Sequence, residues 1–139
     1  MKIMAIDLGD ARTGLAISDK TEFLASPAGV IFERNREKLL SKICEKASEL
    51  SAEMIVVGHP LNMDGSRGER ATLCSEMAEK IKELTGLPVV LWDERRTTTE
   101  AHGILTETGC FGKKRKQTVD AVAATLILEG YLTFRKNQK

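Results

Sequence analysis

The chain has 139 residues, 42% of them hydrophobic and 29% charged, and its 21 basic and 20 acidic side chains leave a net charge of +1. This composition excludes a disordered chain and predicts a single domain over residues 1–139 with one ordinary core. No apolar run approaches the roughly 20 residues that span a bilayer, and Asp7 interrupts the apolar stretch that a signal peptide needs, so we expect a cytoplasmic protein without membrane contact.

The N-terminal part of the sequence predicts three strands. They cover Lys2–Leu8, Arg12–Ser18 and Ala25–Phe32, and only short polar turns separate them. Consecutive strands joined by turns of a few residues pair antiparallel, so we expect a meander.

A helix and a buried strand follow the meander. Asn35 is a suitable N-cap for a helix, and apolar residues recur at helical spacing as far as Leu50. Met54–Gly58 is an unbroken apolar run, which is typical of a strand covered on both faces.

The next helix and strand have clear boundaries. Ser66 and Glu69 form a capping-box pattern that predicts the start of a helix, and Gly86 predicts its end. Pro88–Trp92 is then a further short apolar strand.

The C-terminal part predicts helical structure interrupted by a basic loop. A second capping box at Thr97–Glu100 opens a helix that Gly109 ends, and Lys113–Lys116 forms the loop. Thr118 then caps a last helix that continues to about Phe134. Because this helix is apolar nearly all round, we expect it to pack deep against the sheet.

The predicted order is therefore β-β-β-α-β-α-β-α. The first three strands are antiparallel, and the last two need helical crossovers and run parallel. This is the order of the ribonuclease-H-like fold, a three-layer α/β fold with helices on both faces of a mixed five-stranded sheet.

Acidic side chains from distant segments are expected at one edge of this sheet. Asp7 ends the first strand, Glu94 follows the fifth, and Asp120 lies in the first turn of the last helix. Ligands bind outside the carboxyl ends of parallel strands. Carboxylates are suitable ligands for Mg²⁺ or Mn²⁺, and two such ions can activate a water for the hydrolysis of a phosphodiester. Each acid taken alone has another explanation. Asp7 could cap a turn, Glu94 could form an ion pair with a neighbouring arginine, and Asp120 could interact favourably with the positive end of a helix dipole.

Four blocks of the sequence resemble the YqgF family of ribonuclease-H-like proteins, whose members are described as pre-16S rRNA nucleases or Holliday junction resolvases. The similar blocks are Asp7–Ala16, Val57–Gly65, Asp93–Thr98 and Val119–Ala124, in the family's order over nearly the whole chain. The resemblance implies that Asp7, Glu94 and Asp120 are the catalytic acids and the metal ligands. The chain departs from the family at His59 and Arg96, where members commonly carry apolar residues, and both positions concern substrate contacts.

A nucleic acid is the expected partner. Glycine lets the backbone approach a ligand, and basic side chains can hold phosphates near the metals. His59 is either a phosphate contact or an idle loop residue, and His102 is interpreted as structural. With one Trp and one Tyr, stacking platforms are not evident, so we expect recognition through backbone and shape. The expected contacts are Gly9, Arg12, His59, Asn62, Arg95, Lys113, Lys114, Arg115 and Lys116.

The predicted function is metal-dependent hydrolysis of phosphodiester bonds in the 5′-end processing of precursor 16S rRNA, a structured RNA. Cleavage of branched DNA as a Holliday junction resolvase is the alternative, and a non-catalytic RNA- or ribosome-associated module is a further one. The opening motif also resembles the phosphate loop of actin-like and sugar kinases, which hold ATP between two related domains. Both a monomer and a homodimer fit the sequence, and junction cleavage would favour the dimer.

Overall fold

The computed structural model describes residues 1–9, 11–60, 68–93 and 112–137, with the backbone alone for residues 112–120. The elements in these ranges are β1 (Ile3–Asp7), β2 (Arg12–Ser18), β3 (Ala25–Phe32), α1 (Arg36–Glu49), β4 (Met54–His59), α2 (Glu69–Thr85), β5 (Val89–Asp93) and α4 (Gly112–Asn137). Their order is the predicted one, and each strand begins and ends within one residue of its predicted bounds.

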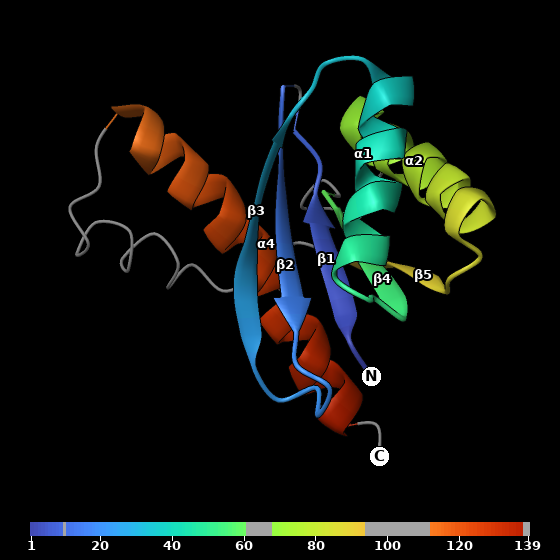
Figure 1. Ribbon diagram of the computed structural model, residues 1–139, viewed down its shortest axis with the longest axis vertical. Coiled ribbons are helices and arrows are strands. Elements are labelled where there is room, and N and C mark those ends of the chain that lie inside the picture. The colour runs from blue at the N-terminus through green and yellow to red at the C-terminus, as the bar shows by residue number, and fades with distance from the viewer. Residues whose placement is uncertain (10, 61–67, 94–111, 138–139) are drawn as a thin grey trace.

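The five strands form one mixed sheet in the order β3-β2-β1-β4-β5. The pairs β1–β2 and β2–β3 are antiparallel, whereas β1–β4 and β4–β5 are parallel. Figure 1 shows α1 and α2 together on one face of the sheet and α4 crossing the other. The predicted three-layer fold is therefore confirmed.

Strand alternation divides the buried side chains into two cores. On β1, Met4 and Ile6 belong to the core beneath α1 and α2. Ile3 and Ala5 belong to the core beneath α4. Because successive side chains of a strand point to opposite faces, these two sets fix the face on which every residue of β1 lies.

The helix ends agree only in part with the predicted caps. The Asn35 side chain accepts a hydrogen bond from the Lys38 amide, and Gly86 ends α2 in the left-handed conformation with φ 71°, as expected. The predicted cap at Ser66 is wrong, because α2 begins two residues later with Gly68 as its N-cap and no side-chain cap bond. Glycine is tolerated at this position because it adopts the required extended backbone without strain.

The basic run is helical, which corrects the prediction of a loop. Helix α4 begins at Gly112 rather than after Thr118, so Lys113–Lys116 lies within its first turns. Lysine, arginine and glutamine have high helix propensity, which explains the extension. The helix predicted from Thr97 to Gly109 lies outside the described residues. None of the described helices is long and apolar enough to cross a membrane.

Two side-chain clusters hold α4 in place. Trp92 of β5 makes edge contacts with Tyr131 and Phe134, with ring centroids 5.8 and 5.7 Å apart. At the far end of the helix, Arg135 Nε donates to Glu22 Oε1 over 2.7 Å and ties α4 to the turn between β2 and β3. These contacts confirm that the last helix packs closely on the sheet.

Candidate functional site

The carboxyl ends of the three parallel strands lie along one edge of the sheet and carry polar residues. β1 ends at Asp7, one residue beyond the Ile6–Val57 pair. β4 continues to His59, which pairs with Asp93 at the end of β5. This edge is where the crossover topology directs a ligand, and it is the edge that the sequence predicts.

The two faces of this edge carry different groups. Asp7 continues the Ile3–Ala5 series and therefore faces α4, on the side where the backbone of residue 120 also lies. His59 continues the Ile55–Val57 series and faces α2 instead. The sheet therefore separates Asp7 from the histidine, although both side chains lie at the same edge.

The turn after Asp7 is held closely by its neighbours. A Cβ on Gly9 would lie 2.1 Å from the carbonyl oxygen of Arg12, which no side chain can tolerate. The close approach at Gly9 is to the chain's own backbone, and the predicted ligand contact at Gly9 stays a prediction. From α2, Arg70 Nη2 donates to the carbonyl oxygen of Leu8 over 2.6 Å. The backbone that carries Asp7 is thus fixed from β2 and from α2.

His59 is neither in a loop nor idle, which corrects one of the two interpretations. It is the last residue of β4, its side chain is buried at 7% exposure, and its Nε2 lies 3.3 Å from Ser75 Oγ. The Ser75 hydroxyl donates to the Ala71 carbonyl oxygen over 3.1 Å. The contact between His59 Nε2 and Ser75 Oγ joins the end of β4 to α2.

The structure places only part of the predicted site. Asp7, Gly9 and Arg12 lie together at the edge on β1, the following turn and β2. Asp120 and the basic run of residues 113–116 belong to α4, whose side chains are not described there. Other predicted positions lie outside the described residues, namely Asn62, Glu94, Arg95, Arg96 and His102. The convergence of Asp7, Glu94 and Asp120 therefore stays a prediction.

The donor chemistry of Asp7 fits a hard divalent cation, because a half-buried carboxylate at a strand end offers oxygen ligands on a rigid element. Within the described ranges, no three histidine, cysteine, aspartate or glutamate side chains are close enough together to hold a metal. A complete metal site would therefore need carboxylates beyond these side chains.

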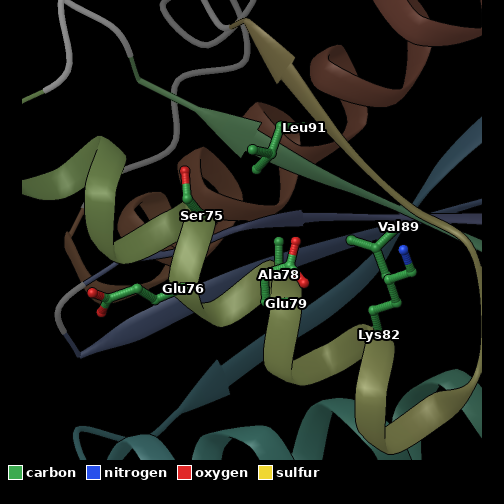
Figure 2. Close-up of a pocket in the computed structure, with 7 residues that line it drawn as sticks. All are labelled: Ser75, Glu76, Ala78, Glu79, Lys82, Val89 and Leu91. Atoms are coloured by element: carbon green, nitrogen blue, oxygen red, sulfur yellow. The ribbon is translucent and has the colours of Figure 1, made fainter.

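A cavity of about 440 Å³ lies between α2 and β5, on the face opposite Asp7. Figure 2 shows Ser75 and Leu91 at one end of this cavity and Lys82 with Val89 at the other. Its walls mix apolar side chains with Glu76, Glu79 and Lys82. Because the sheet lies between this cavity and Asp7, the cavity is not the place for chemistry at that carboxylate.

Sequence reasoning missed three side chains at this edge. Arg70 and Ser75 act through contacts with residues 62 and 16 positions away, and no local pattern indicates such contacts. Phe32 is 54% exposed at the end of β3, where it pairs with Arg12. Its exposed position could have been read from the alternation with Ile31, which is apolar and buried.

Comparisons with known proteins agree over nearly the full chain. Residues 1–134 match the family model described as RuvX: Holliday junction resolvase. A protein of Lachnospira eligens named "Putative pre-16S rRNA nuclease" is 42% identical over 135 residues, covering 95% of this chain and 96% of the relative. A protein of the same name from Halothermothrix orenii is also 42% identical, covering 97% of this chain and 96% of the relative.

Among solved structures, Thermus thermophilus RuvC in complex with a Holliday junction substrate superposes with a TM-score of 0.64 at 15% identity, covering 97% of this chain and 96% of that chain. At this identity the likeness shows the fold. It supports a ribonuclease-H-like architecture independently of the sequence blocks.

Proposed function

The chain belongs to the RuvX family of Holliday junction resolvases, and from this membership we propose that it is a metal-dependent nuclease whose substrate is the 5′ region of precursor 16S rRNA. The observation that carries the proposal is similarity over nearly the whole chain to relatives named as pre-16S rRNA nucleases. A substrate of this kind implies action in the cytoplasm.

The proposed catalytic carboxylates are Asp7, Glu94 and Asp120, which would hold Mg²⁺ or Mn²⁺. When bound, the ion supplies a Lewis acid that polarises the scissile phosphate. Asp7 is held on a buried strand, and the turn behind it is fixed by Gly9 and Arg70. Such fixation suits a ligand that must keep its geometry as charge develops on the phosphate.

Recognition of the substrate would rest mainly on its backbone. Gly14 of β2 pairs with Asp7, and Arg12 lies two residues before Gly14, on the same face of the sheet as Asp7. Its guanidinium therefore suits a phosphate next to the scissile one. Further phosphate contacts are proposed for Asn62, Arg95 and the basic run of residues 113–116. Cations of this kind hold nucleic acid without reading its sequence.

Cleavage of a Holliday junction is the second candidate. The description of the family and the fold shared with a junction-bound RuvC both favour it. A two-fold junction would require two active sites related by symmetry, and hence a homodimer. A non-catalytic RNA-binding module is the remaining possibility, and it differs from the nucleases in needing no metal.

The deciding experiment offers the protein a structured precursor-rRNA 5′ region and a four-way DNA junction, each with Mn²⁺ or Mg²⁺. We expect cleavage of the RNA that is lost in Asp7→Asn and kept in Glu53→Gln, an exposed acid that precedes β4 at the opposite edge of the sheet. Preferred cleavage of the junction, with a dimer in sedimentation, would support the second candidate. If Asp7→Asn cleaved as fast as the unaltered protein, the proposed site would be wrong.

A further inference from the structure

An exposed aromatic side chain lies on the same face and at the same edge as Asp7. Phe32 is the last residue of β3 and pairs with Arg12 of β2, and Gly14 of β2 pairs with Asp7 of β1. Ile31 is buried in the core beneath α1 and α2, so Phe32 points to the opposite face. Asp7, Arg12 and Phe32 therefore follow one another across three adjacent strands.

The surroundings of Phe32 are cationic. Arg34 follows it two residues later, is exposed, and makes no ion pair within the described part of the chain. The acid between Phe32 and Arg34 is Glu33, and its charge is paired, because Lys42 Nζ donates to Glu33 Oε1 over 3.0 Å and this bond lowers the pKa of Glu33. We refer to Arg12, Phe32 and Arg34 as the Phe32 strip.

The position of the strip suits a strand of nucleic acid that continues from the active site. Neighbouring strands lie about 4.8 Å apart and residues rise about 3.3 Å along a strand, so Phe32 lies roughly 12 Å from Asp7. A polynucleotide covers that span in a few nucleotides. An aromatic face flanked by arginines is the combination that binds single strands, with bases stacked on the ring and phosphates held by the cations.

We propose that the Phe32 strip binds a single-stranded segment of the substrate, with a base stacked on the Phe32 ring and the neighbouring phosphates held by Arg12 and Arg34. This inference rests on the proposed function and extends it to a second contact region. A protein partner fits less well, because a single aromatic ring among arginines offers little continuous apolar area. The exposed pair Phe23 and Leu24 lies at the other end of β3, away from this strip.

The test measures binding of a fluorescent 12-nucleotide single strand in EDTA, so that no cleavage is needed. Phe32→Ala should weaken binding by about 5- to 100-fold, the range that one stacked base accounts for. Phe32→Tyr should restore it, since the ring is kept. Phe23→Ala is the matched control, because Phe23 is 67% exposed at the opposite end of the hairpin, and it should bind normally.

Two further readouts separate stacking from charge. An oligonucleotide of abasic sites should bind Phe32→Ala and the unaltered protein equally, because it has no base to stack. Arg34→Gln should lower the salt dependence of binding by about one phosphate contact, whereas Phe32→Ala should leave that dependence unchanged. In Phe32→Trp, quenching of the new surface indole on binding would report the stacked base directly.

The inference is overturned if Phe32→Ala binds as tightly as the unaltered protein, if the unaltered protein binds no single strand, or if Phe32→Ala only abolishes self-association. These outcomes differ from failure of the proposed function. Stacking at Phe32 without cleavage of any substrate would refute the nuclease and keep the strip. Cleavage and binding that are both unchanged in Phe32→Ala would support the proposed nuclease and contradict the proposed binding role of the Phe32 strip.

Discussion

Replacing Gly9 with alanine should destabilise the protein and disturb the backbone that carries Asp7. The added Cβ would lie 2.1 Å from the Arg12 carbonyl oxygen, more than 1 Å inside ordinary contact. The obstacle is the backbone of β2, which is held in register with β3 by the Arg12–Phe32 pair and cannot rotate away like a side chain. Forced overpacking of this kind costs about 1–3 kcal/mol, which for a chain of this size lowers the Tm by about 3–12 °C.

The same substitution at Gly130 provides the control. There the nearest atoms belong to the Trp92 ring, at 3.2 to 3.4 Å, and a ring can shift by a few tenths of an ångström. Alanine also gains about 1 kcal/mol over glycine in a helix interior, so the free energy of unfolding of Gly130→Ala should stay within about 1 kcal/mol of the original.

Urea unfolding and thermal melts of both variants test this reasoning. Cleavage by Gly9→Ala, measured well below its Tm, should also fall, because the turn between Asp7 and Arg12 has to move. If Gly9→Ala is as stable as Gly130→Ala, the turn relaxes at no cost, and the close contact does not fix the position of Asp7.

Two other predictions concern contacts made over long distances in the sequence. Arg70→Met removes the donor to the Leu8 carbonyl oxygen, so hydrogen exchange of the Leu8 and Gly9 amides should accelerate, and kcat should fall with KM little changed. Lys80→Met on the same helix is the control and should alter neither the exchange rates nor kcat. A rise in KM alone in Arg70→Met would instead indicate a substrate contact. The hydrogen bond from Arg135, and after it that from the α-ammonium of Met1, lowers the pKa of Glu22. Its stabilising effect is therefore complete above the ordinary glutamate pKa and disappears as pH falls through the lowered value. Glu22→Gln should accordingly be less stable than the unaltered protein at pH 7 and equally stable near pH 2, and urea midpoints that differ by the same amount at both pH values would contradict this account.

The elements that sequence reasoning placed well are those with a strong local pattern. Met54–Gly58 is an unbroken apolar run, which is typical of a strand covered on both faces, and it lies in β4. Asn35 meets the chemical demand of an N-cap by itself, and its side chain makes the expected bond. In both cases the signal lies within a few residues, so tertiary packing had little to override.

The errors occurred where two local patterns competed. Ser66 and Glu69 have the spacing of a capping box, yet the N-cap of α2 is Gly68. Its extended backbone suits the N-cap position without a side-chain hydrogen bond. Lys113–Lys116 was interpreted as a loop from its charge, although these side chains have high helix propensity and the apolar helix that follows extends back through them. Charge alone describes exposure, and it does not distinguish a solvated loop from a solvated helix face.

The arrangement of polar residues at the site edge depends on a period of two that the sequence already contains. Ile3, Ala5 and Asp7 share one face of β1, and Ile55, Val57 and His59 share the other face of β4. A list of polar residues at strand ends therefore combines groups that the sheet keeps apart. Asp7 and Arg12 face α4, where a metal and a phosphate backbone are proposed, whereas His59 is bonded to Ser75 on α2. Because the imidazole lies on the opposite face of the sheet from Asp7 and contacts Ser75, its departure from the family pattern bears on how α2 packs, and a phosphate contact at His59 stays a prediction.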